Sequence, residues 1–177
     1  MNCILQNEII DNVLDSFRAD LGKDFEQYRN HVYRVYNLAI IRLTSEDDIR
    51  TMSIAAAYHD LGIWTGHTFD YLKPSISLAG KYCLLNGIDQ VTQLNIETII
   101  NEHHKLSRIA NNDPAEIFRQ ADLADLTLGW RRHGMDRDRI RELKRTFPNR
   151  GFHLNLGKLF PKNLFVNPLR PLPMYKW

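Results

Sequence analysis

The chain has 177 residues, of which 44% are hydrophobic and 25% are charged, and its formal net charge is +2 with the seven histidines neutral. This composition is close to the average of soluble globular domains and far from the charge-rich, aromatic-poor profile of intrinsically disordered chains. A chain of this length can bury about 70% of its unfolded surface, so we expect one domain with a core of its own.

Only two cysteines are present, Cys3 and Cys83, and no CxxC spacing occurs. This excludes a disulfide framework and a thiolate zinc site. The N-terminal residues lack a basic segment followed by an uninterrupted apolar stretch, and no window approaches the about 18 apolar residues of a membrane span. We therefore expect a cytoplasmic protein with no membrane partner.

Apolar residues recur every three or four positions over most of the chain, which predicts an all-α fold. The third expected helix begins at the capping residue Ser45 and carries the small residues 53–57, so it can pack closely and should lie at the centre of a compact helical bundle. In chain order, helices are expected over about residues 7–20, 24–43, 45–59, 75–86, 90–104, 113–128 and 136–146, with a loop over about 61–74.

The composition changes after Pro148. We expect a helical domain over residues 1–150 and an extended, proline-rich C-terminal segment over 151–177 that packs on it. The segment cannot sustain a helix because it contains Pro161, Pro168, Pro171 and Pro173, and its apolar anchors are expected to be Phe160, Phe165, Leu169, Leu172 and Trp177.

The stretch Arg131–Arg150 contains eight arginines and lysines against three acidic residues. A solvated helix face explains such an excess more often than a polyanionic partner does. We therefore do not expect nucleic acid as a partner. A homodimer is compatible with the sequence.

Two helices carry histidines that are suited to metal binding. His31 shares a helix face with Tyr28 and Val35, which points its ring toward the core. His59 and Asp60 close the alanine-rich third helix, where a loosened turn lets both side chains reach one ion. Taken singly, a core histidine and a chance His-Asp pair are the commoner explanations, so the prediction depends on a further ligand.

That ligand is expected on a later helix, where Asp122 and Asp125 lie three residues apart on one side. At least one of the two carboxylates should be buried and should need a cation or hydrogen-bond donors. Ion pairs with Arg119 or Arg131 explain these aspartates equally well when the helix is considered alone. In combination with the two histidines, they predict a divalent metal site.

The order H, then HD, then D over separate helices resembles the HD superfamily of metal-dependent phosphohydrolases. The resemblance implies an HD-type helical bundle and one divalent ion bound by His31, His59, Asp60 and Asp122, with Asp125 as the competitor of Asp122. It covers residues 28–129 and rests on the strings HVYRV at 31–35, AAYHDLG at 56–62 and ADLAD at 121–125.

Many members of that superfamily bind a second metal ion through two more histidines. The segment 75–82, where the first of these is expected, contains none, so we do not expect a second ion. The resemblance then assigns His103 and His104 to the pocket, as proton donor or phosphate ligand. His67 in the loop is an alternative ligand, although an exposed loop histidine is the commoner case.

Mixed histidine and carboxylate ligation suits Mn, Fe, Co, Ni, Mg or Zn and disfavours Ca. Such an ion lowers the pKa of its water toward neutrality, and this water is expected to attack phosphorus with Asp60 orienting it. Arg34 and Lys105 are expected to bind phosphate oxygens. Thr65 and Lys73, in a loop with aromatic rings suited to stacking on a base, are expected to line the substrate wall.

The expected activity is therefore metal-dependent hydrolysis of a nucleotide or another small phosphate ester. One alternative is an HD-fold diiron oxygenase, which needs the fuller set of histidines and is separated from the hydrolase by iron content and oxygen uptake. The other is a catalytically inactive HD-fold module that senses a nucleotide or binds a protein through residues 131–150 and the C-terminal segment. The intact ligand set argues against this second alternative.

Overall fold

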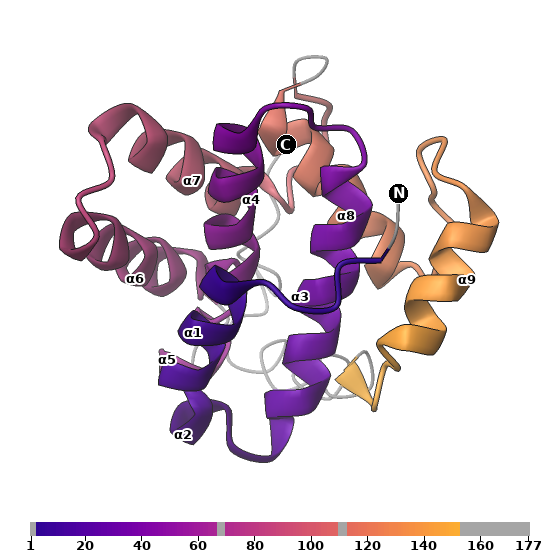
Figure 1. Cartoon of the computed structure of the whole chain (residues 1–177), viewed down its shortest axis with the longest axis horizontal. Helices are drawn as coiled ribbons and strands as arrows, with labels where there is room; N and C mark the ends of the chain where they lie inside the picture. Colours follow the sequence, from indigo (N-terminus) through magenta and orange to yellow (C-terminus); the bar gives the residue numbers. More distant parts are fainter. Residues whose placement is uncertain (1–2, 67–69, 110–112, 153–177) are drawn as a thin grey trace, which may run out of the picture.

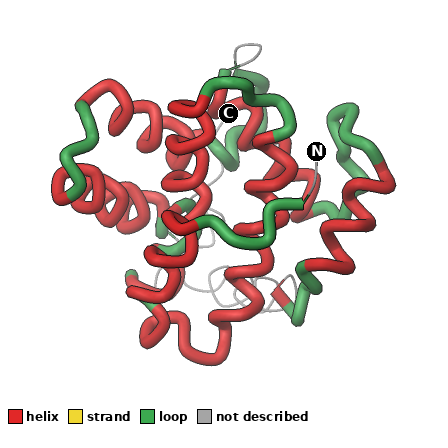
Figure 2. Tube along the Cα trace, viewed as in Figure 1, coloured by secondary structure: helices red, strands yellow, loops and turns green. Residues whose placement is uncertain are grey.

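The protein is described here from a computed structural model covering residues 3–66, 70–109 and 113–152. Throughout these residues the regular structure is helical and includes no strand, which confirms the predicted all-α class (Figures 1 and 2). The helices are α1 (Glu8–Ser16), α2 (Arg18–Leu21), η1 (Gly22–Asp24), α3 (Phe25–Ile40), α4 (Glu46–Tyr58), α5 (Gly62–Thr65), α6 (Leu72–Leu85), α7 (Gln90–Glu102), α8 (Pro114–Leu126) and α9 (Arg137–Thr146).

Side-chain caps begin most of the longer helices. Ser45 accepts a hydrogen bond from the backbone N–H of Asp48, as the sequence predicts. Asp113 does the same for Ala115, and Pro114 occupies the first helical position, where no backbone donor is needed. These caps fix where α4 and α8 start, and therefore which residues reach the interior one or more turns later.

Two local expectations were wrong. The single helix expected over 7–20 is broken at Phe17, whose φ of −106° and ψ of 17° end α1. The Phe17 ring packs edge-on against Tyr58, with ring centroids 6.2 Å apart, so a contact with α4 sets the break. The loop expected over 61–74 contains α5 and the first turn of α6, which Pro74 can enter because the first turn of a helix needs no backbone donor.

Four helices build the centre of the molecule. α3 lies against α4 and α8, and α7 lies against the same two helices. The short side chains Ala55, Ala56 and Ala57 are fully buried and let these helices approach α4 closely. α1 and α6 also pack on α4, which confirms its predicted central place (Figure 1).

α9 packs on the outer side of α3 (Figure 1). It buries Ile140 and Leu143 and exposes much of its basic face, as a solvated helix face predicts. In the described part of the chain, no helix is long and apolar enough to cross a membrane. The predicted C-terminal segment lies outside the described residues from position 153 onward.

Candidate metal centre

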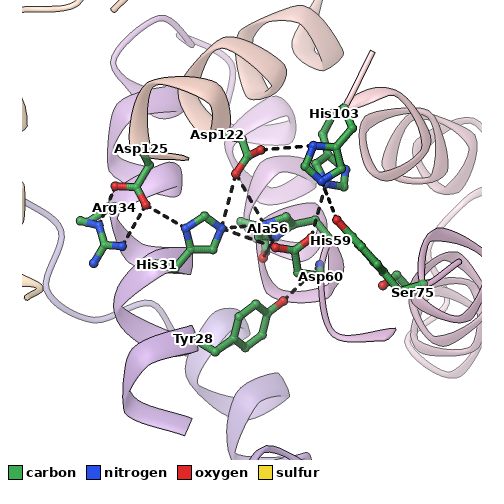
Figure 3. Close-up of polar contacts among 12 residues, drawn as sticks. Tyr28, His31, Arg34, Ala56, His59, Asp60, Ser75, His103, Asp122 and Asp125 are labelled. Atoms are coloured by element: carbon green, nitrogen blue, oxygen red, sulfur yellow. Dashed lines mark hydrogen bonds and ion pairs between the residues drawn. The ribbon is translucent and has the colours of Figure 1, made fainter. Parts of the chain in front are cut away.

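The four central helices bring six polar side chains together (Figure 3). Each comes from a helix interior or from the residues that end a helix, so their positions follow from the packing of the four helices. Nearly all are buried, and His104 keeps 11% of its side chain exposed. They are His31 on α3, His59 and Asp60 after α4, His103 and His104 after α7, and Asp122 on α8.

Three of the four side chains expected to bind a metal form a first group, with donor atoms within 4.8 Å of one another, and an oxygen of the fourth, Asp60, lies beside them. The first group is His31, His59 and Asp122. The Nε2 atoms of His31 and His59 are 3.0 Å apart, and Asp122 Oδ1 lies 3.4 Å from the first and 4.0 Å from the second. Asp60 Oδ2 lies 3.7 Å from His31 Nε2 and 3.4 Å from His59 Nε2. Ligands about 2.1 Å from a common ion are about 3.0 Å apart at a right angle, so these separations fit a shared cation.

Hydrogen bonds to the other ring nitrogens fix which atoms face the rest of this group. His59 Nδ1 is 2.8 Å from the carbonyl oxygen of Ala56, and His31 Nδ1 is 2.8 Å from a carboxylate oxygen of Asp125. Both partners can only accept, so in the neutral rings Nδ1 carries the hydrogen and Nε2 presents a lone pair. Burial lowers the pKa of His31 to about 4, which keeps that ring neutral at neutral pH.

Two buried atoms beside the first group have no hydrogen-bond partner among the described residues. They are Asp60 Oδ1 and His103 Nε2, which lie 3.4 Å apart. His103 Nδ1 is 2.7 Å from the carbonyl oxygen of Ile100, so its Nε2 also presents a lone pair. A buried polar atom left unpaired costs about 1–3 kcal/mol, and a cation satisfies a carboxylate oxygen and an imidazole lone pair at once.

Asp60, His103 and His104 form a second group of donor atoms that lie within 4.8 Å of one another. The sequence predicts no second group of ligands, because residues 75–82 contain no histidine. Asp60 links the two groups through its two carboxylate oxygens. Oδ2 lies beside His31 and His59, and Oδ1 lies beside His103. His104 Nε2 is 2.5 Å from the Tyr71 hydroxyl, which either donates or accepts, so the state of His104 Nδ1 depends on that proton.

The two aspartates of α8 have different partners (Figure 3). Asp122 faces the cluster, whereas Asp125 lies on the opposite side of the His31 ring and receives two bonds from Arg34, at 2.6 and 2.9 Å. Burial would raise the pKa of Asp125, but the hydrogen bonds from His31 and Arg34 hold it well below its usual range. Asp125 therefore orients His31, and the geometry favours Asp122 as the ligand.

The charge of Asp60 disfavours ionisation of the other carboxyl group of the cluster, Asp122. Burial, together with the charges of Asp60 and Asp125, raises the pKa of Asp122 to about 8. A divalent cation removes this conflict because it lets both carboxylates ionise together.

Aromatic rings and one glycine hold the cluster in place. Phe152 stacks on His31 with ring centroids 4.1 Å apart, and Phe118 packs edge-on against His59 at 5.2 Å. The Tyr28 hydroxyl accepts the backbone N–H of Asp60 and donates to the carbonyl oxygen of Ala57. A Cβ at Gly62 would collide with the backbone oxygen of Tyr71, so only glycine fits directly after this turn.

Arg34 is not placed to bind a substrate phosphate, contrary to expectation. Its side chain is buried, and its three terminal nitrogens donate to Asp125 and to the carbonyl oxygen of Phe147. The one-turn spacing from His31 put both residues on one side of α3, but the guanidinium lies beside Asp125, away from the cluster. The prediction failed because sequence spacing fixes a helix face and does not fix the partner.

Of the other residues expected to bind substrate, Lys105 lines a pocket, whereas Thr65 and Lys73 do not. Lys105 pairs with Glu102 at 3.3 Å and lines a pocket beside the cluster. The Thr65 hydroxyl is 3.2 Å from the carbonyl oxygen of Leu61, and Lys73 keeps 85% of its side chain exposed beside Asp70. Neither of these two lines the pocket, and His67 lies outside the described residues.

The pocket has a volume of about 720 Å³ and reaches the cluster through His103, His104 and Asp122. The pocket is also lined by Arg42, Lys105, Leu106, Arg108, Glu116, Arg119, Gln120, Leu123, Leu126, Thr127, Arg131 and His133.

Comparison of the chain with protein-family models, curated proteins and solved structures found no match.

Proposed function

We propose that the chain is an HD-type, metal-dependent phosphohydrolase that acts on a nucleotide or another small phosphate ester. The resident cofactor is one divalent ion held by His31, His59, Asp60 and Asp122. The observation that carries the proposal is the pair of imidazole lone pairs, on His31 and His59, that meet at 3.0 Å beside two buried carboxylates. Because Nδ1 of each ring faces a group that can only accept, both Nε2 lone pairs face the same space, and a cation is its natural occupant.

The donor set suits the proposed chemistry. Two neutral imidazoles and two carboxylates balance a divalent charge, and this mixture of nitrogen and oxygen ligands accommodates Mn, Fe, Co, Ni, Mg or Zn. When bound, such an ion polarises a phosphoryl oxygen and lowers the pKa of a coordinated water. The adjacent pocket supplies the space for the ester, since it reaches the ligand Asp122 directly.

The chain supplies proton acceptors on the cluster side of the pocket. In ester hydrolysis the oxygen of water bonds to phosphorus, the ester P–O bond breaks, and its electron pair stays on the leaving oxygen. The proton lost by water passes to Asp60 Oδ1 or His103 Nε2, which are buried and otherwise unpaired among the described residues. His103 also lines the pocket and can pass the proton that it takes from water to the leaving oxygen. Burial and the neighbouring His103 hold the pKa of His104 well below its usual range, so His104 is a neutral hydrogen-bonding group beside that oxygen, with the Tyr71 hydroxyl 2.5 Å from its Nε2.

The experiment is elemental analysis of the wild-type protein beside His59→Ala and Asp122→Asn, with a panel of phosphate esters assayed on each sample. Asp138→Asn is the matched control, because its carboxylate is 78% exposed and far from the ligand set. We expect one metal ion per chain and phosphate release in the wild type and the control, and the loss of both in the other two variants. Circular dichroism checks that each variant folds.

Wild-type protein that binds no metal after addition of manganese, nickel or zinc would overturn the proposal and leave the nucleotide-sensing module. A variant at His59 that keeps full turnover would do the same. Bound iron with oxygen uptake and no phosphate release would instead identify the diiron alternative. Each result is read against the Asp138→Asn sample, which corrects for losses during purification.

A further inference from the structure

The pocket beside the cluster is strongly cationic. Five of its lining residues are arginine or lysine, against two carboxylates. The cations come from four separate stretches of sequence, so they do not form a cluster of basic residues along the chain. They are Arg42 after α3, Lys105 and Arg108 after α7, Arg119 on α8, and Arg131 between α8 and α9.

The two carboxylates are already engaged. Glu116 receives two bonds from Arg119, at 2.8 and 2.7 Å, and the backbone N–H of Ile109. Burial would raise the pKa of Glu116, but these donors lower it to about 2, so it stays ionised and paired. The other carboxylate, Asp122, lies in the metal cluster.

Arg42 and Arg131 therefore keep an uncompensated charge. Within the described residues, neither forms an ion pair with a carboxylate. Arg42 Nη1 donates to the neutral amide oxygen of Gln120 at 2.6 Å, and the Arg131 guanidinium lies over the Trp130 ring, 5.6 Å from its centroid. Both side chains belong to exposed residues that line the pocket, where a ligand can reach them.

The guanidinium groups converge on the same space. His133 lines the same pocket, and burial together with the charges of Arg119, Arg131 and Arg42 lowers the pKa of its ring. Like charges gathered in a cavity repel one another, and an anion relieves that repulsion. Arginine is also the side chain whose planar fork binds a phosphate through two parallel hydrogen bonds.

We propose that the substrate carries at least two phosphate groups, one lying at the metal cluster and the other held by Arg42 and Arg131. This rests on the proposed function, since it names the substrate class of the same site. A single phosphate at the cluster would leave both guanidiniums without a counter-charge. A pocket of about 720 Å³ has room for a nucleoside diphosphate or triphosphate or a sugar bisphosphate.

The test measures anion binding by isothermal titration calorimetry on metal-loaded protein and on protein stripped with EDTA, which excludes chelation as a source of heat. The probes are inorganic phosphate, pyrophosphate with adjacent phosphates, and fructose 1,6-bisphosphate with separated ones. The variant is the double substitution Arg42→Gln with Arg131→Gln. Arg145→Gln is the control, because Arg145 is exposed on α9 and does not line the pocket.

We expect at least one two-phosphate probe to bind metal-loaded wild type about tenfold more tightly than inorganic phosphate, as charge-assisted hydrogen bonds allow. The double variant should lose about tenfold for that probe and less than about threefold for inorganic phosphate, and Arg145→Gln should match wild type. The tighter of the two probes identifies the spacing of the phosphates.

Two results overturn the inference. Either both probes bind no better than inorganic phosphate, or the double variant binds them as Arg145→Gln does. The stripped protein separates this failure from failure of the proposed function. Arginine-dependent pyrophosphate binding without any ester hydrolysis by metal-loaded wild type would remove the hydrolase and keep the two-phosphate pocket. If the double variant hydrolyses a monophosphate ester as fast as wild type and the two-phosphate probes bind no better than inorganic phosphate, the hydrolase stands and the two-phosphate inference is overturned.

Discussion

The two sides of the His31 ring differ in how completely their charges are paired. On the Nδ1 side, Asp125 accepts bonds from His31 and Arg34, so each buried charge meets its opposite. On the Nε2 side, the lone pair of His31 meets the lone pair of His59 and two acidic groups, Asp60 and Asp122. The first side is paired within the chain, whereas the second leaves lone pairs and carboxyl groups facing one another, and this difference is what distinguishes a structural ion pair from the metal site that we propose.

The largest effect is expected on the paired side. Arg34→Met should lower the free energy of unfolding by about 3–5 kcal/mol, because it leaves the buried charge of Asp125 without its guanidinium. Urea denaturation measures the loss. The control Arg141→Met breaks an ion pair with Asp138 whose side chains are 64% and 78% exposed, and it should cost no more than about 1 kcal/mol. Equal losses in the two variants would contradict the comparison.

The two aspartates should then respond to pH in opposite directions in metal-free protein. The folded-state pKa of Asp122 is raised from 3.8 to about 8, so the folded state binds more protons than the unfolded state between these values, and stability falls as pH rises. Asp122→Asn should gain stability over wild type across this window, on the order of a few kcal/mol. Urea denaturation at a series of pH values gives the difference.

Asp125→Asn is the matched variant, three residues away on the same helix. The pKa of Asp125 is lowered in the folded state, so its contribution is present above its ordinary value of 3.8 and is lost as pH falls. This variant should be less stable than wild type at neutral pH and approach wild type in acid. Parallel pH curves for the two variants would show that the two sides of His31 are alike.

Metal binding should remove the imbalance on the Nε2 side. An ion present at 100 times its dissociation constant should stabilise the folded state by about 2.7 kcal/mol, which corresponds to a rise of about 5–10 °C in Tm for a domain of this size. We expect one ion per chain, because both imidazole protons of the first group are fixed by acceptor-only partners, whereas in the second group only that of His103 is. Two ions per chain, falling to one in His104→Ala, would show that the second group also binds metal.

The sequence predicted that the side chains of His31, His59 and Asp122 lie inside the bundle because helical periodicity decides which side chains point inward. The three residues are buried on three helices, and the packing of those helices brings the side chains together. The break at Phe17 could not be predicted in this way, because a contact with Tyr58 on another helix sets it.

The cationic pocket could not be predicted for a related reason. Its charges come from four stretches that only the tertiary structure brings together, and each stretch by itself resembles an ordinary polar surface. The basic run 131–150 drew attention in the sequence, yet of its eight cations only Arg131 lines the pocket. Charge density along the chain is therefore a poor guide to charge density around a cavity.

The smallest expected effects are on the steady-state kinetics of variants at Lys73 and Lys105, which were both expected to contact the substrate. Lys73 is 85% exposed, 3.9 Å from Asp70, and does not line the pocket, whereas Lys105 lines it beside His104. Lys105→Ala should therefore raise the KM for a phosphate ester several-fold, on the order of one weakened charged contact, and Lys73→Ala should change neither kcat nor KM beyond about twofold. Steady-state kinetics with one ester measures both. A rise in KM confined to Lys73→Ala would place the substrate along the 61–74 segment and away from the cationic pocket. The reason is that salt screens an exposed ammonium group, so it affects binding only of a ligand that lies close to it.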